Sequence, residues 1–263
     1  MKTKTKKIVI GSTCTALIAA ISVGGTLAYL TTETTPKTNN FTFASDALTA
    51  VLTEPDWDGI IDYVDIDGTV TPIYGYDEGE DGNLEPITTK PTVDADGENI
   101  VYGEDVAKNM VPGTVVAKDP TITNTCDLSE YVAVKVRFVY SSGENSGKPL
   151  EGTDLTTVMD VITVDYDADK DTGAVWERKA DEDKDDASQT FYYKTEVAGG
   201  GSTEPLFNTV TVNEDATSEQ INALNEMGGF QIVVEGYAAQ ADTVEYDTFK
   251  TDVTFGSDTT TTN

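Results

Sequence analysis

A strict alternation of apolar and polar residues in two long segments is the strongest constraint on the fold. Along Val132–Tyr140 every second residue is a large apolar one, while Ala133, Lys135 and Arg137 alternate with them. Residues 230–238 repeat this pattern. A period of two places alternate side chains on opposite faces of a β-strand. Both segments are therefore predicted to be strands with at least one buried face.

Shorter segments rich in valine, threonine and aromatic residues are also predicted to be strands. They are Phe41–Leu52, Thr114–Thr123, Val161–Tyr166, Gln189–Val197, Leu206–Val212 and Val244–Phe255. Only one helix is expected: Thr217 and Gln220 have capping-box spacing, and Gly228–Gly229 would end the helix. Many strands with one short helix predict an all-β fold, a jelly-roll-like β-sandwich with long acidic loop insertions.

Two acidic segments interrupt the strand pattern. Pro55–Asp105 is crowded with Asp, Glu, Gly and Tyr, and we interpret it as a long insertion with short hairpins around Ile60–Ile66 and Ile100–Tyr102. Asp165–Asp186 is interpreted as a solvated hairpin tip that carries an exposed Trp176. Neither segment contains an internal repeat.

The first 28 residues have the organisation of a secretory signal peptide. Four lysines precede an apolar segment, Ile8–Ala28, that ends in small residues. We expect cleavage between Ala28 and Tyr29. An uncleaved membrane anchor is the alternative because the segment is long enough to span a bilayer. Glycine, serine and threonine dilute the segment, however, and no basic stop-transfer cluster follows it, so a secreted protein is the prediction.

The rest of the chain divides into three parts. Residues 29–40 are expected to form a flexible N-terminal arm that could act as a donor strand. Residues 41–255 would form a single β-sandwich domain with the insertion at about 55–105. Residues 256–263 are expected to be a disordered polar tail.

The chain is strongly acidic, with a formal net charge of −30. Removal of the leader takes away four lysines, which leaves 13 basic against 47 acidic side chains, or about −34. Nucleic acids and anionic membranes are recognised through lysine and arginine. We therefore expect no nucleic-acid partner and, after processing, no membrane partner, whereas divalent cations and cationic partners would be attracted.

The residue inventory limits the chemistry. The chain has no histidine, which excludes Ser-His-Asp and Cys-His catalysis and the HExxH zinc site. Acid pairs for glycoside hydrolysis stay open, because carboxylates are everywhere and no pair stands out. Cys126 would be the only cysteine after processing, so it forms no intramolecular disulfide; it either links subunits or is an inert, half-buried thiol. No enzymatic activity is expected.

Calcium is the one inorganic ligand that the sequence brings into consideration. Asp165, Asp167, Asp169 and Asp171 alternate as carboxylates do in calcium loops. Lys170 stands where an EF-hand has glycine, however, and the position of the bidentate glutamate holds a tryptophan. A weak calcium site and ordinary solvated turns are the two interpretations. No other cofactor is expected.

Several motifs, in order along the chain, resemble the TasA/camelysin family of Gram-positive biofilm-matrix proteins. They are Gly24–Leu30 at the cleavage region, Phe41–Ser45 leading into Leu48 and Leu52, Val111–Gly113, Lys118–Pro120, Thr123–Thr125, and Phe230–Val234 running to Ala238–Ala241. Residues 31–33 depart from the commoner family sequence after the cut, and both acidic segments lack a counterpart in the family.

This resemblance implies a jelly-roll subunit that is processed by a SipW-like signal peptidase and assembles into extracellular fibres. In the family, the freed N-terminal segment can lie in a neighbour's sheet as a donated strand. Here that segment would be an assembly arm carrying Tyr29, Leu30, Thr31, Phe41 and Phe43. Its partners would be other copies of the chain, together with other matrix or cell-surface components.

The sequence is compatible with three functions. The first is a secreted structural protein of extracellular fibres or biofilm matrix, assembled by N-terminal strand donation. The second is a monomeric cell-surface adhesin or ligand-binding sandwich, with glycan or protein bound by the insertion around Trp57, Tyr63, Tyr74, Tyr76 and Tyr102. The third is a hydrolase that uses acids alone or a bound metal. We expect the first.

Overall fold

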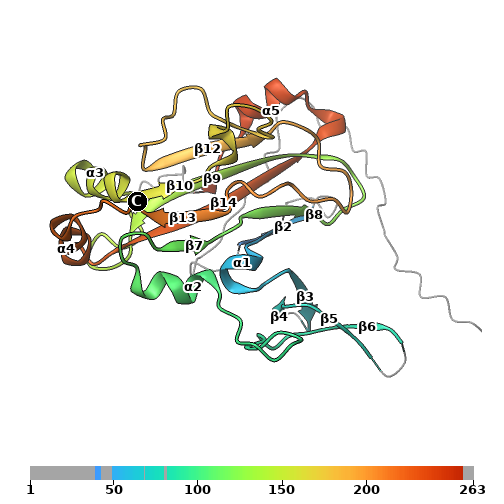
Figure 1. The fold of residues 1–263 in the computed structure, drawn as a ribbon. Helices are drawn as coiled ribbons and strands as arrows, with labels where there is room; N and C mark the ends of the chain where they lie inside the picture. Colours follow the sequence, from blue (N-terminus) through green and yellow to red (C-terminus); the bar gives the residue numbers. More distant parts are fainter. Residues whose placement is uncertain (1–38, 43–48, 68, 80–81, 257–263) are drawn as a thin grey trace, which may run out of the picture.

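The computed structural model describes residues 39–42, 49–67, 69–79 and 82–256. This part is mostly β-strand, arranged in several antiparallel sheets, with a few short helices. The all-β class expected from the sequence is confirmed. Figure 1 shows two layers of strands, with helices at one end and on both outer sides.

One layer is a four-stranded sheet in the order β11-β12-β9-β14. Its strands are β11 (Trp176–Arg178), β12 (Ser188–Tyr193), β9 (Glu130–Tyr140) and β14 (Phe230–Gln240). The two alternating segments of the sequence are therefore neighbours: β9 and β14 pair over their whole lengths, with Val136 opposite Val234. The predicted division of faces in β9 is confirmed, because Val134 packs into the main core and Ala133 into a separate cluster on the opposite face.

The second layer contains two three-stranded sheets, β1-β2-β8 and β10-β13-β7. Its strands are β1 (Asn39–Thr42), β2 (Thr49–Thr53), β8 (Thr121–Asn124), β10 (Ile162–Val164), β13 (Thr209–Val212) and β7 (Val115–Ala117). The expected strand Phe41–Leu52 is thus two antiparallel strands. The expected strand Thr114–Thr123 is also two, one in each sheet.

Backbone hydrogen bonds outside the strands join these two sheets into one continuous layer. The Lys118 N–H donates to the carbonyl of Asn208, and the Leu206 N–H donates to the carbonyl of Pro120. The chain through β7 and β8 therefore runs antiparallel to the chain that leads into β13. Pro120 accepts without needing to donate, so a proline is tolerated at this position.

The core lies between the two layers and draws on almost every strand. Its largest fully buried side chains include Trp176, Phe138, Phe191 and Phe207. The prediction of an exposed Trp176 at a solvated hairpin tip is wrong. The tryptophan begins β11, opposite Tyr193 of β12, and is 0% exposed. The many aspartates around Trp176 led to the prediction of a solvated segment. Burial of this one large apolar side chain instead brings the start of β11 into the core.

A second, smaller cluster covers the outer face of the four-stranded sheet. Helix α5 (Tyr246–Asp252) places Phe249 against Ala133, Tyr192 and Tyr237. The expected strand Val244–Phe255 is therefore wrong. Its valines and threonines favour a strand, but the helix is held by burial of Phe249 on a sheet face that would otherwise meet water.

The expected helix is confirmed as α4 (Ser218–Glu226), with both capping-box hydrogen bonds between Thr217 and Gln220. Gly228 and Gly229 follow it with positive φ, a conformation that favours glycine. The expectation of a single helix is wrong, because α3 (Gly152–Val161) packs against α4. The threonines of α3 have low helix propensity, and for this reason the sequence did not predict the helix.

Shorter helical turns complete the elements. They are α1 (Pro55–Asp58), α2 (Gly103–Val106), η1 (Ala107–Asn109), η2 (Asp167–Asp169) and η3 (Ala241–Thr243). No helix in the described ranges has the length and apolar character needed to cross a bilayer.

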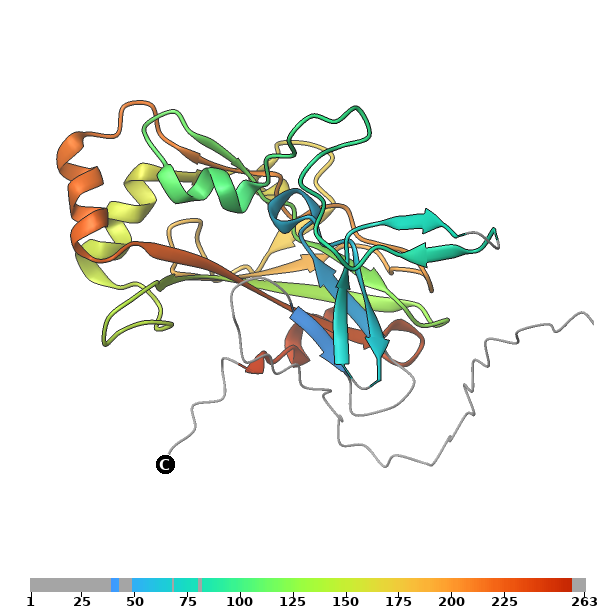
Figure 2. The ribbon, with the colours of Figure 1, turned by 90° about the horizontal axis from the view of Figure 1, so that it is seen from below.

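The insertion forms two hairpins that project from the sandwich. They pair β3 (Asp62–Ile66) with β4 (Thr69–Ile73), and β5 (Tyr76–Glu78) with β6 (Leu84–Pro86). Figures 1 and 2 show them beside the second layer, away from α3 and α4. The hairpin predicted at Ile60–Ile66 is confirmed. At the predicted Ile100–Tyr102 hairpin there is only one nearby bridge, Val93 with Asn99.

The smaller cluster yields a stability prediction. Phe249→Ala should lower the free energy of unfolding by about 3–5 kcal/mol, because it removes a buried ring and leaves a cavity under α5. Leu84→Ala is the control, since Leu84 is 71% exposed, and it should change stability by less than about 0.5 kcal/mol. Urea unfolding measures both. Equal losses in the two variants would contradict the packing of α5 on the sheet.

Candidate functional site

A cleft of about 630 Å³ opens between the two layers, at the end of the sandwich that carries α4. Its walls are mainly apolar. The apolar lining residues are Trp57, Ala107, Met110, Val116, Val161, Ile162, Val210, Val212, Ile221, Leu224, Phe230 and Ile232. The polar lining residues include Glu104, Lys108 and Lys118. We call this feature the interlayer cleft.

Strand β7 forms one border of the interlayer cleft and is the edge strand of its sheet. The Val212 N–H donates to Thr114, and the Lys118 N–H donates to Asn208. In an antiparallel ladder, hydrogen-bonded positions alternate along the strand. The register therefore turns the backbone N–H and C=O groups of Val115 and Ala117 away from β13, toward the open side.

Helix α2 closes one end of that edge. A Cβ atom on Gly103 would lie 1.9 Å from the carbonyl oxygen of Ala117, so only glycine allows the helix to approach this closely. Val115 is 54% exposed. The accessible part of the β7 edge is therefore centred on Val115.

Strand β14 forms the opposite border and is the edge strand of the four-stranded sheet. The backbone of Phe138 bonds to Ala187 and Leu150, on the side of β9 away from β14. Phe138 and its register partner Ile232 therefore form a non-hydrogen-bonded pair. The backbone N–H and C=O of Ile232 point away from β9, toward the free edge of β14. The same alternation applies to Phe230, and both residues line the cleft.

An apolar space between two sheet edges is suited to an extended polypeptide. Edge N–H and C=O groups can pair with an added strand, and the apolar walls can accept its alternate side chains. The cleft therefore provides backbone recognition and side-chain pockets together.

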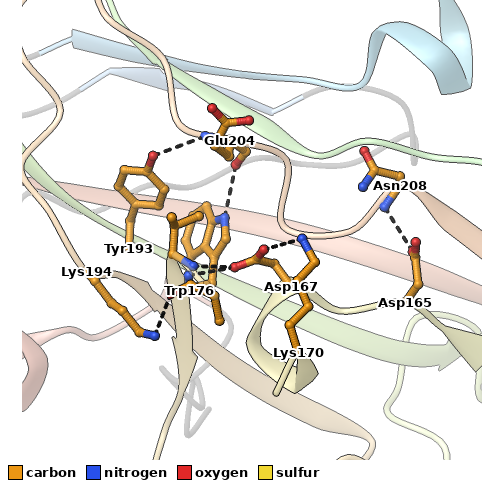
Figure 3. A network of polar contacts seen from close by, with 10 residues as sticks. Asp165, Asp167, Lys170, Trp176, Tyr193, Lys194, Glu204 and Asn208 are labelled. Atoms are coloured by element: carbon orange, nitrogen blue, oxygen red, sulfur yellow. Dashed lines mark hydrogen bonds and ion pairs between the residues drawn. The ribbon is translucent and has the colours of Figure 1, made fainter. Parts of the chain in front are cut away.

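The four candidate calcium ligands do not converge. Asp165 accepts the backbone N–H groups of Asn208 and Thr209, at 3.0 and 2.6 Å. Asp167 accepts the N–H of Trp176 at 2.9 Å and the ammonium group of Lys170 at 2.6 Å. Figure 3 shows the two carboxylates directed toward different partners.

The next two aspartates also lie apart. Asp169 forms a bidentate pair with Arg178, and Asp171 is exposed. Within the described ranges, no group of three or more His, Cys, Asp or Glu residues is placed to hold a metal ion. A calcium site there stays a prediction.

Asp167 instead stabilises the entry into β11. Burial acts to raise the pKa of its carboxyl, but hydrogen bonds from Lys170 and from the backbone of Val175 and Trp176 outweigh burial and lower the pKa. The carboxylate thus holds the chain where Trp176 enters the core. The indole Nε1 in turn donates to the carbonyl of Glu204 (Figure 3).

Most of the predicted assembly arm lies outside the described residues. This applies to Tyr29, Leu30, Thr31 and Phe43, to the signal peptide, and to its cleavage site at Ala28. Phe41 is within β1, which is the edge strand of β1-β2-β8 and places Phe41 opposite Ala50. The chain therefore reaches the sandwich at a sheet edge. The polar tail 257–263 is also outside the described residues.

Cys126 is half-buried beside a fully buried carboxyl group. Its Sγ lies 3.4 Å from Oε1 of Glu130, which is 0% exposed. Burial raises the pKa of the Cys126 thiol, and burial raises the pKa of Glu130 to about 7. Both groups are thus stabilised in their neutral forms. The half-buried position agrees with the inert-thiol alternative, and a link between subunits through this thiol is untested.

The aromatic residues proposed for ligand binding differ in their exposure. Trp57 lines the cleft. Tyr102 is buried at the root of the insertion, and its hydroxyl donates a hydrogen bond to the carbonyl of Pro91. Tyr63 and Tyr74 are half-buried, and Tyr76 is 47% exposed. Of these five rings, only that of Tyr76 is exposed to solvent. Ligand binding by this group stays a prediction.

Sequence reasoning missed the interlayer cleft because its lining comes from segments far apart in the chain. One local signal exists: Val115–Ala117 is apolar at every position, so this strand has an apolar side chain on both faces. Comparison with protein-family models, curated proteins and solved structures finds no match.

The buried Glu130 predicts a pH dependence of stability. Its folded-state pKa is raised from 4.5 to about 7, so the folded state binds more protons than the unfolded state between these values. Stability should therefore fall as the pH rises from about 4.5 to 7. Glu130→Gln should be more stable than the wild type at pH 8, by about 1–3 kcal/mol, and the advantage should vanish below pH 4.5.

Urea unfolding at pH 4, 6 and 8 measures this effect. Glu144→Gln, in an exposed loop, is the control for the loss of one negative charge. A Glu130→Gln difference that is constant across pH would contradict the prediction.

Proposed function

We propose that this protein is a secreted structural protein, a subunit of extracellular fibres or biofilm matrix. In a fibre, the N-terminal arm of one copy would occupy the interlayer cleft of the next as a donated strand. The observation that carries the proposal is the apolar cleft bordered by two open sheet edges. The proposal includes no catalytic step and no membrane attachment after processing.

Three features support this assignment. The leader has the organisation of a signal peptide, which would release a free N-terminus. The two-layer β architecture agrees with a jelly-roll-like sandwich, the finer topology that we propose. The motifs that resemble those of the TasA/camelysin family point to a fibre-forming class of protein. Secretion and fibre formation are both open to direct test.

The arm has the composition that such a cleft requires. Residues 29–40 lack a helix signal, contain many threonines, and begin with Tyr29 and Leu30. Threonine favours extended structure. Pro36 would interrupt the added ladder once, so the donated strand would lie on one side of this residue.

A second candidate is favoured by the insertion. Its hairpins expose Ile66, Val70, Tyr76 and Leu84 among many carboxylates. An apolar surface with acidic borders suits binding of a cationic protein at the cell surface. A monomeric adhesin would retain this surface and form no fibres.

Electron microscopy of the purified mature chain tests the fibre proposal. Chains from residue 29 should form filaments, whereas chains lacking 29–38, which keep β1 intact, should stay monomeric and folded. Val115→Pro should also block filaments, because it removes an N–H on the open side of β7 but no hydrogen bond to β13. Val115→Thr, which keeps the N–H, is the matched control. Filaments from the truncated chain would refute strand donation, and discrete particles from the mature chain would favour the adhesin.

The acidic surface makes a separate prediction about salt. Copies carrying about −34 charges repel one another, and the Debye length falls from about 30 Å at 0.01 M salt to about 8 Å at 0.15 M. Filaments should therefore form faster at 0.15 M than at 0.01 M sodium chloride, as measured by light scattering. Calcium and magnesium should act alike at matched ionic strength. A specific acceleration by calcium would instead reveal a calcium site.

A further inference from the structure

A buried lysine and a buried glutamate meet at the inner end of the interlayer cleft. Lys118 follows β7, and Glu54 follows β2 and occupies the N-cap position of α1, with no hydrogen bond from its side chain to the helix. The lysine Nζ lies 2.5 Å from Oε2 of Glu54, and their side chains are 4% and 8% exposed. The ring of Trp57 lies beside the ammonium group, with its centroid 4.6 Å from Nζ.

A second acid accompanies this pair. Asp58 comes four residues after Glu54, so the two residues are on one side of α1. It is 2% exposed and close enough to interact electrostatically with both Glu54 and Lys118. Burial raises the pKa of Asp58 to about 7, which keeps much of this group protonated near neutral pH.

An ion pair between Lys118 and Glu54 leaves several buried polar atoms around it without hydrogen-bond partners among the described residues. Oε1 of Glu54, Oδ2 of Asp58 and Nε1 of Trp57 are buried and have no hydrogen-bond partner within the described part of the chain. A carboxylate and an ammonium group removed from water need several partners each, because their desolvation costs several kcal/mol per ion. An amide has one donor and one acceptor and carries no charge. The polar groups present fit an amide better than a charged pair.

We propose that the Lys118 Nζ and the Glu54 side chain become joined by an isopeptide bond. The lysine first transfers a proton to the carboxylate, which leaves a neutral amine beside a carboxylic acid. The nitrogen lone pair then attacks Cδ of Glu54 and forms the C–N bond. The nitrogen loses one proton, a carboxyl oxygen leaves as water, and no oxidant or other reactant is consumed.

Asp58 is the proton carrier in this step. Its protonated carboxyl gives a proton to the departing oxygen, and the resulting carboxylate takes the proton released by the nitrogen, so Asp58 ends as it began. The apolar contact with Trp57 excludes water, which favours condensation over hydrolysis. Close approach of nitrogen and carboxyl carbon in a fixed geometry supplies the proximity such a reaction needs.

The bond would join the root of the acidic insertion to the second layer. Covalent closure between residues 54 and 118 constrains the unfolded chain over a long loop, the effect that makes other cross-links stabilising. This inference concerns the subunit itself and does not depend on fibre formation.

Intact mass spectrometry of the denatured mature chain tests the proposal. The wild type should be lighter than the sum of its residues by one water molecule. A protease digest should yield a branched peptide that contains both Lys118 and Glu54. Lys118→Arg, which keeps the positive charge, should have its full calculated mass. A wild type at full mass would overturn the bond.

A second variant tests the role of Asp58. Asp58→Asn should accumulate the unlinked form, with its full calculated mass, because the amide cannot carry the proton. Circular dichroism of the same sample establishes that it is folded. If folded Asp58→Asn is linked as completely as the wild type, Asp58 is not the proton carrier.

Discussion

The pairing of β9 with β14 is the interaction on which the rest of the structure depends. The two strands are hydrogen-bonded along their entire lengths, and β9 is buried on both faces. Its inner face supplies the valines and Phe138 of the main core, whereas Ala133 faces the cluster under α5. A slip of one residue would exchange the faces and place Lys135 and Arg137 in the main core. The pairing therefore fixes both layers at once.

The same pairing determines where the sandwich is left open. Because β14 is the edge strand of the four-stranded sheet and β7 the edge strand of the β10-β13-β7 sheet, backbone groups of two sheet edges border one cleft. Natural proteins usually cover or charge such edges. Here α2 covers only the Ala117 end, where Gly103 permits close contact. An edge that is partly covered and otherwise lined by apolar side chains is what one expects of a surface that binds another strand.

The sequence predicted the features that depend on local patterns. Alternation identified β9 and β14, and the Thr217–Gln220 pair located α4. It failed where tertiary burial overrides local preference: Phe249 holds a helix in a segment of β-branched residues, and Trp176 is buried amid aspartates. The cleft and the Lys118 site could not be predicted. Each combines residues distant in the chain, and no local pattern records which edges a sheet leaves open.

The energetics of strand donation explain why a rigid cleft matters. Each apolar side chain that enters such a cleft contributes about 1.5–3 kcal/mol, whereas association costs at least about 4 kcal/mol in lost freedom of motion. A threonine-rich arm offers few large apolar side chains, so little binding energy is left to reshape the acceptor. Strand donation as we propose it would therefore require a cleft that exists before the arm binds.

Lys118 and Trp57 line the inner end of this cleft, and Glu54 connects that wall to β2. An ion pair in this position can separate when the wall moves, at the cost of two unpaired buried charges. An amide bond cannot separate. Covalent attachment at this point would hold the wall in the shape that receives the arm, so that the binding energy of a few side chains goes into association.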